Sequence, residues 1–257
     1  FTGGTKTGAH IAKVAAPMFK KLSLELGGKN PAIIFSDCDY NEMLQTTVRS
    51  SFANQGQICL CGSRIFVEAS IYQKFKTDFI AAVSKLKVGS PFNNNTDIGA
   101  LVSKTHLNKV KSYVDNAEQY GGKVVFGGNL VAVESSENGY YLEPTIIEVN
   151  DNSCILNQEE IFGPVVTIMP FNEESEVLAM ANDVSYGLSA TLWTNDLKRT
   201  MRVSKQLDAG IVWVNTWLLR DLRTPFGGMK NSGVGREGGF QALRFFTEPK
   251  NICIKYN

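Results

Sequence analysis

The sequence predicts an α/β protein whose central sheet is mostly parallel. Of its 257 residues, 43% are hydrophobic, which is enough to bury a substantial core. Short apolar runs typical of buried strands alternate with longer segments in which apolar residues recur every three or four positions, as in helices. Alternation of this kind indicates an α/β domain with a largely parallel sheet.

Glycine and proline signals organise the beginning of the chain. Gly3 and Gly4 end a short strand and lead into a helix over about 5–16, which Pro17 terminates. A briefly alternating segment over 22–28 then breaks at paired glycines.

The following segments read as a strand and three helices. The run 31–35 predicts a buried strand, and residues 39–55 are expected to be helical. Ser70 is the expected N-cap of a helix with apolar residues at three- and four-residue spacing, and a further helix follows Ser103.

The remaining strands share β-branched and aromatic residues bounded by turn signals. They are expected at 64–68, 123–127, 165–171, 189–194 and 211–215. Helical patterns lie near 174–183 and 197–207. The stretch 249–256 alternates like a lone strand, which must find a sheet edge in its own subunit or in a neighbouring one.

Charge and hydropathy exclude several classes of partner. Lys and Arg total 26 against 25 for Asp and Glu, with no basic block, so we expect no nucleic acid partner. No apolar run approaches the roughly 20 residues that span a bilayer, so we expect no membrane partner and a cytoplasmic location. The five cysteines are scattered, which favours reduced thiols, and their spacing suggests no metal site.

One cysteine and one glutamate stand out as candidates for chemistry. Cys59 follows the small polar run NQGQ, and Glu25 lies among leucines before two glycines. Alone, Cys59 would more often be a small buried hydrophobe and Glu25 a solvated charge. Together they could supply a nucleophile, activated by a lowered thiol pKa, and a general base with a raised pKa.

Four motifs carry a resemblance to a known family. They are LSLELGGKNP at 22–31, FANQGQICLCGSR at 52–64, EEIFGPV at 159–165 and PFGGMKNSGVGRE at 225–237. In order and spacing they resemble the catalytic half of the NAD(P)-dependent aldehyde dehydrogenase superfamily. The resemblance runs from Phe1 to about Tyr256 and implies that family's fold and activity.

The resemblance implies a role for each catalytic residue. Cys59 would attack the aldehyde to form a thiohemiacetal, hydride would pass to the nicotinamide, and Glu25 would activate the water that hydrolyses the thioester. The oxyanion of the thiohemiacetal would be bound in part by the backbone N–H of Cys59. Cys61 falls on a non-essential position.

The expected cofactor is NAD, with NADP not excluded. The turn GGTKTG resembles the family's pyrophosphate-binding turn at a helix N-terminus. Further positions match contacts with the nicotinamide or a ribose. The implied cofactor-binding residues are Gly3, Gly4, Gly8, Leu26, Gly27, Glu160, Phe162 and, in some family members, Lys109.

Two arginines before the last motif suggest the substrate class. Arg220 and Arg223 lie where many relatives line the substrate tunnel, and guanidinium groups suit a carboxylate on the aldehyde. Trp217, with Trp213, is expected to wall the same region. The neighbouring stretches resemble in particular the subfamily of 2-aminomuconic and 2-hydroxymuconic semialdehyde dehydrogenases. The alternative is that both arginines pair with Asp221 or other acids.

Family members are about twice this long, which shapes the expected organisation. Residues 1–27 would be a remnant of the Rossmann-like NAD-binding domain, 28–240 the catalytic domain and 241–257 an oligomerisation strand. Full-length relatives of this kind form homodimers or homotetramers. Without the rest of the nucleotide-binding domain and its asparagine oxyanion donor, the isolated chain is expected to be inactive.

Two competing interpretations stay open. A cysteine hydrolase would need a histidine base, but no motif brings His10 or His106 near Cys59. Alternatively, the chain could be a non-catalytic structural or interaction fragment, although such a protein has no reason to keep both Cys59 and Glu25.

Overall fold

The computed structural model describes residues 1–134, 136 and 138–257, and its centre is a seven-stranded sheet. In sheet order the strands are β4 (Gly122–Phe126), β5 (Thr145–Val149), β6 (Val165–Phe171), β3 (Gly62–Glu68), β2 (Asn30–Ile34), β8 (Ser189–Trp193) and β9 (Ile211–Val214). Only β4 and β5 pair antiparallel in this sheet. The predicted α/β fold with a mostly parallel sheet is confirmed.

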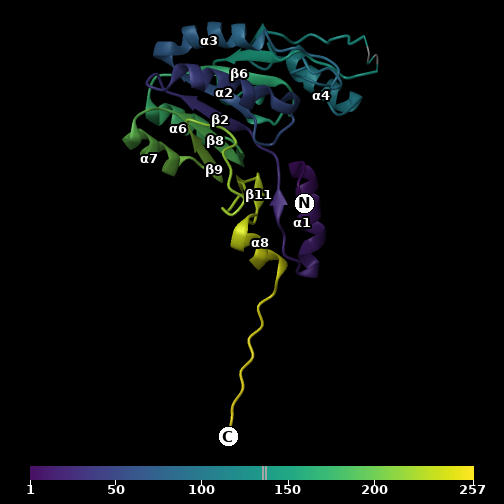
Figure 1. Cartoon of the computed structure of the whole chain (residues 1–257), viewed down its shortest axis with the longest axis vertical. Coiled ribbons are helices and arrows are strands. Elements are labelled where there is room, and N and C mark those ends of the chain that lie inside the picture. The colour runs from purple at the N-terminus through teal and green to yellow at the C-terminus, as the bar shows by residue number, and fades with distance from the viewer. Residues whose placement is uncertain (135, 137) are drawn as a thin grey trace.

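Helices cover both faces of the sheet, as Figure 1 shows. α2 (Tyr40–Phe52) and α3 (Ala69–Val83) pack on one face, whereas α6 (Glu174–Asn182) and α7 (Leu197–Gln206) pack on the other. Residues alternate between these two cores along each strand, so that Ala32 and Ile34 meet α2 and α3 while Ile33 meets α6 and α7. β2 is therefore buried on both sides, which fixes the residues at its start.

Side-chain caps explain most helix starts that the sequence predicts. Asp39 accepts a hydrogen bond from the backbone of Glu42 at the start of α2, and Ser103 accepts one from His106 at the start of α4 (Lys104–Asp115). The predicted cap at Ser70 is wrong. α3 begins at Ala69, and its N-cap, Glu68, makes no side-chain capping bond.

Below the sheet, on the side away from α3, Figure 1 shows the first helix near β11 (Gly233–Val234). α1 (Thr5–Ala15) confirms the predicted first helix, and the 3₁₀ turn η1 (Ala16–Met18) follows it. The other short elements are η2 (Ala53–Gly56), α5 (Ile155–Gln158), β1 (Leu24–Glu25), which pairs with β11 (Gly233–Val234), and β7 (Tyr186–Gly187), which pairs with β10 (Met229–Lys230).

The C-terminal segment differs from the sequence-based expectation. α8 (Gly239–Phe246) occupies the beginning of the predicted strand segment 241–257. Residues 249–256 form no strand in the described chain and extend away from its body (Figure 1). β5 was not predicted. No described helix has the length and apolar character needed to cross a membrane.

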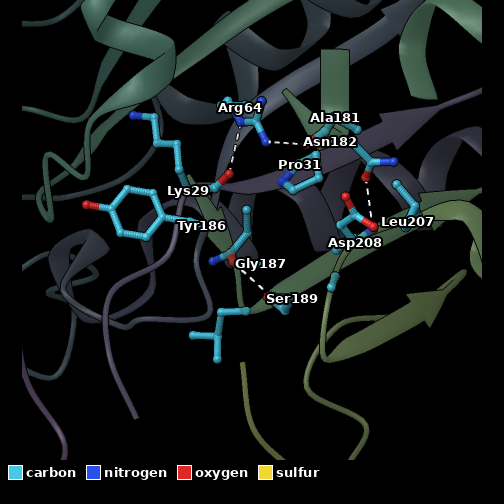
Figure 2. Close-up of a pocket in the computed structure, with 14 residues that line it drawn as sticks. Lys29, Pro31, Arg64, Ala181, Asn182, Tyr186, Gly187, Ser189, Leu207 and Asp208 are labelled. Atoms are coloured by element: carbon cyan, nitrogen blue, oxygen red, sulfur yellow. Dashed lines mark hydrogen bonds between the residues drawn. The ribbon is translucent and has the colours of Figure 1, made fainter. Parts of the chain in front are cut away.

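A buried cation joins the sheet to α6. Arg64 on β3 is fully buried and donates hydrogen bonds to the carbonyl oxygens of Lys29 (2.9 Å), Met180 (2.9 Å) and Ala181 (2.8 Å). Figure 2 shows its guanidinium between Lys29 and the end of α6. The helix C-terminus supplies partial negative charge that offsets part of the cost of burial, although burial still lowers the pKa of Arg64 to about 9.

We predict that Arg64→Met destabilises the fold. The carbonyls of Lys29 and Ala181 would lose the donor that Arg64 supplies, whereas that of Met180 keeps Asn152 Nδ2 at 3.2 Å. At about 1 kcal/mol or more for each lost bond, the free energy of unfolding should fall by at least about 2 kcal/mol. Urea unfolding measures this quantity, with Arg244→Met on the exposed face of α8 as the control. A loss for Arg64→Met no larger than that of the control would contradict this role.

Candidate active site

The turn before Cys59 has an unusual backbone. Asn54, Gln55 and Gly56 all have positive φ angles, at 50°, 58° and 69°. A side chain at Gly56 would put its Cβ 2.1 Å from the carbonyl oxygen of Gly163, so only glycine fits there. This close approach brings the segment carrying Cys59 against the one carrying Glu160.

A cleft of about 490 Å³ gathers residues from five separate segments of the chain. Its lining residues are Thr2, Gly3, Gly4, Glu25, Leu26, Gly27, Gln57, Ile58, Cys59, His106, Lys109, Glu160 and Phe162. The two candidate catalytic residues therefore share one cleft. Most of the residues expected to contact a cofactor lie in it as well.

Glu25 is a buried carboxyl with an incomplete set of hydrogen bonds. It is 5% exposed, and its Oε1 has no hydrogen-bond partner among the described residues. Burial, followed by the charge of Glu237, raises its pKa from 4.5 to about 7, while Arg236 and Arg220 act in the opposite direction. A carboxyl with this pKa exchanges its proton near neutral pH, as a general base must.

The surroundings of Cys59 differ from those expected of an activated cysteine. Burial raises the pKa of the thiol, and the charges of Glu160 and Glu25 raise it further. The pKa of this thiol is thus shifted away from the lowered value that is typical of activated cysteines. Here the thiol is protonated at neutral pH, so a nearby base is needed to remove its proton.

The Glu160 carboxylate contacts the two glycines of the ELGG segment, residues 25–28. The backbone N–H of Gly28 donates to its Oε1 at 2.8 Å, and a Cβ on Gly27 would lie 2.5 Å from its Oε2. Lys109 Nζ donates to the backbone oxygen of Glu160 at 3.0 Å. Glu160 and Lys109 both line the cleft, and their contacts with ribose groups of a cofactor stay predictions.

His106 lines the cleft although no motif indicated it. Its Nε2 lies 2.6 Å from the carbonyl oxygen of Phe162, so this ring nitrogen carries the hydrogen and donates. The fold thus brings His106 into the cleft that Cys59 lines, although no motif places it there. A nitrogen bonded to a carbonyl is not available as a base toward Cys59. His10 is exposed on α1.

Gly8 and Trp217 lie outside the cleft and pack behind it. A Cβ on Gly8 would lie 2.5 Å from the side chain of Leu26, so this glycine lets α1 approach the ELGG segment. Trp217 is buried in one apolar cluster with Trp213, and its Nε1 donates to the carbonyl oxygen of Leu60 at 3.0 Å.

The two arginines have different surroundings. Arg223 is exposed and forms a paired ion contact with Asp221, which was the alternative considered for both arginines. The Arg220 guanidinium lies 4.3 Å from the ring centroid of Phe226 and lines a small cavity of about 100 Å³ with Glu237. Its charge lowers the pKa of both Glu25 and Cys59, although Arg220 is exposed and does not line their cleft.

The fold and cleft define an α/β protein with a half-buried thiol and a buried carboxyl in one cleft, and similarity to known proteins identifies its family. Residues 1–252 match the model of the aldehyde dehydrogenase family, and the chain belongs to that family. It is 53% identical, over its whole length, to 2-aminomuconic semialdehyde dehydrogenase of Danio rerio. It is 46% identical, over 99% of its length, to 2-aminomuconic 6-semialdehyde dehydrogenase of a Pseudomonas species.

A solved structure with the same fold is betaine aldehyde dehydrogenase from Staphylococcus aureus in complex with NAD+. The TM-score is 0.91 at 41% identity, and the match covers 95% of this chain and 48% of that one. The two curated relatives are covered over 53% and 52% of their lengths. The chain thus spans about half the length of the proteins it matches.

The raised pKa of Glu25 predicts how stability depends on pH. Because the folded chain binds this proton more tightly than the unfolded chain, stability falls as the pH rises from 4.5 to about 7. Glu25→Gln removes that loss, so the variant should exceed the wild type by about 1–3 kcal/mol at pH 8 and lose this advantage near pH 4.

Urea unfolding at several pH values measures this difference. Glu118→Gln, which replaces an exposed glutamate, is the matched control and should show no comparable pH-dependent gain. A difference between wild type and Glu25→Gln that stays constant from pH 4 to pH 8 would show that Glu25 does not have a raised pKa.

Proposed function

We propose that this chain is the catalytic part of an NAD-dependent dehydrogenase that oxidises a carboxylate-bearing aldehyde of the muconic semialdehyde type to the acid. The observation that carries the proposal is the shared cleft of Cys59 and Glu25, with Glu160 and Phe162 at its margin. Membership in the aldehyde dehydrogenase family supports the reaction class.

The proposed chemistry uses the Cys59 thiol and the Glu25 carboxyl in turn. Glu25 takes the proton of Cys59, whose sulfur attacks the aldehyde carbon to form a thiohemiacetal. Its oxyanion is stabilised by the backbone N–H of Cys59. Loss of hydride, for which the nicotinamide would be the acceptor, leaves a thioester. Glu25 releases its first proton to solvent, takes a proton from the water that attacks the thioester, and returns this proton to the departing sulfur. The carboxylic acid leaves and the thiol is restored.

The cleft residues fit a nicotinamide dinucleotide. A Cβ on Gly4 would meet nothing within 4 Å, so there is open space at the N-terminus of α1, where backbone N–H groups attract phosphate. Glu160 would bind ribose hydroxyls, and the backbone of Leu26 and Gly27 and the ring of Phe162 would flank the nicotinamide, which supplies the hydride acceptor. The NAD+ in the Staphylococcus structure supports NAD, and NADP stays an alternative.

Arg220 is the proposed residue that selects a carboxylated substrate. Its charge acts on Glu25 and Cys59, whereas Arg223 is occupied by Asp221. Trp217, although buried behind the cleft, holds the Leu60 carbonyl beside the nucleophile and would shape the substrate site only indirectly. The names of the semialdehyde dehydrogenases to which the chain is similar support this substrate class.

The proposal for Arg220 predicts a substrate-specific defect. In the protein as its gene encodes it, Arg220→Met should raise the KM for a carboxylated semialdehyde by about 10- to 100-fold, because a charge-assisted hydrogen bond is lost. The KM for an uncharged aldehyde of equal length should change far less. Arg223→Met is the control, and steady-state NADH formation is the measurement. Equal effects of the two substitutions would contradict the assignment.

We further propose that the 257 residues alone do not turn over aldehyde, since relatives of twice this length supply more of the nucleotide site. We also propose a cytoplasmic protein, in keeping with five free cysteines, and a homo-oligomer assembled through the C-terminal segment. Exposed apolar side chains there, including Ile252 and Ile254, support such an interface.

A direct assay tests the proposal about the isolated chain. NADH formation should stay at the background rate when the purified 257 residues are mixed with NAD+ and a muconic semialdehyde. The protein encoded by the complete gene is the positive control. Turnover by the isolated chain at a rate near that control would overturn this part of the proposal.

A further inference from the structure

The side chain of Asn30 bonds directly to the backbone around the nucleophile. Asn30 is 3% exposed, and its Nδ2 donates to the carbonyl oxygens of Cys59 at 2.7 Å and Cys61 at 2.9 Å. Its Oδ1 accepts from the backbone N–H of Ser189 at 3.1 Å. Both amide hydrogens and the amide oxygen are therefore used, and the carboxamide has little freedom to rotate.

Asn30 is itself rigidly held. It is the first residue of β2, a central strand between β3 and β8, and the pairing register shifts between Asn30 and Pro31. The preceding residue, Lys29, has its carbonyl fixed by Arg64, as Figure 2 shows. The backbone that carries the Asn30 carboxamide is thus anchored in β2, which is buried at every residue.

The glycine before this pair allows the contact to form. A Cβ on Gly28 would lie 2.8 Å from both the Cys59 carbonyl oxygen and Asn30 Oδ1. The segment that carries Cys59 therefore lies directly against residues 25–30. In the sequence, Asn30 follows Glu25 by only five residues. One short stretch of chain carries both the proposed base and the group that holds the nucleophile's backbone.

We propose that Asn30 is a positioning residue that fixes the backbone of residues 59–61 so that the Cys59 thiol is held in the cleft beside Glu25. Its two N–H groups satisfy the part-buried carbonyl of Cys59 and the buried carbonyl of Cys61. The link to catalysis rests on the proposed function, but the effect on the thiol does not. Asn30 touches neither substrate nor cofactor in this proposal.

Loss of the two donors should change the thiol's surroundings. Residues 59–61 would have to shift toward water to satisfy their carbonyls, and burial is the main reason for the raised pKa of Cys59. Better solvation should lower that pKa. Cys38 and Cys154 pack against separate apolar clusters and should not respond, so they serve as reference thiols in the same molecule.

The test is the rate of iodoacetamide alkylation of each cysteine from pH 6 to pH 10, read by peptide mass spectrometry. In Asn30→Ala, Cys59 should react at least about fivefold faster at pH 8, with the midpoint of its pH profile lowered by about one unit. The rates of Cys38 and Cys154 should stay within about twofold of the wild type.

Two further variants isolate the cause. Asn30→Asp keeps an acceptor for Ser189 but lacks the amide donors, so it should also alter the rate and pH profile of Cys59. Asn182→Ala is the matched control, because the Asn182 carboxamide also bonds to the backbone on both sides. Its Nδ2 donates to the carbonyl oxygen of Gln206 at 2.7 Å, and its Oδ1 accepts from the N–H of Asp208 at 2.8 Å, the second of which Figure 2 shows. It should leave the Cys59 profile unchanged.

Two results would overturn the proposal. One is an unchanged Cys59 profile in both Asn30 variants. The other is a common acceleration of all five cysteines, which would mean that Asn30 only supports the global fold. In the full-length protein, the account also expects Asn30→Ala to lower kcat with little change in the KM for NAD+. Because alkylation needs no turnover, failure of the proposed dehydrogenase activity would leave this test readable.

Discussion

The burial of the Glu25 carboxyl beside the Cys59 thiol is the constraint on which the rest of the site depends. A carboxyl that is 5% exposed with an unpartnered oxygen is costly for the fold, and its pKa of about 7 records that cost. The same burial makes the thiol harder to ionise. The two groups therefore suit a proton transfer between them better than a permanent ion pair, because neither is strongly charged at rest.

The central sheet keeps this unfavourable arrangement in place. β2 begins just after the ELGG segment and is buried by helices on both faces, so the position of Glu25 follows from one of the most rigid parts of the molecule. Glycines at 27, 28 and 56 permit backbone approaches that any Cβ would block, and these approaches bring Glu160 and Cys59 against that segment. Arg64 donates a hydrogen bond to the Lys29 carbonyl just after that segment, and Asn30 donates one to the Cys59 carbonyl.

The sequence predicted those parts of the fold and site that local signals determine. Asp39 and Ser103 cap helices by local hydrogen bonds, and the apolar runs of β2 and β6 are buried on both faces. The four family motifs likewise brought Cys59, Glu25 and Glu160 together. What depends on distant packing was missed. β5 forms between two neighbouring strands, and 249–256 pairs with no strand among the described residues. The raised thiol pKa and the place of His106 in the cleft also depend on contacts that no local pattern encodes.

The central claim is that Cys59 and Glu25 act in turn on one aldehyde carbon in this cleft. Its most direct test is to mix the full-length protein carrying Glu25→Gln with NAD+ and a muconic semialdehyde, and to examine its peptides by mass spectrometry. At a pH high enough to ionise the thiol without a base, the account predicts one equivalent of NADH and an acyl group on Cys59, because hydrolysis of the thioester lacks its base. An acyl group on Cys61, or NADH formed in repeated turnovers at the wild-type rate, would contradict it.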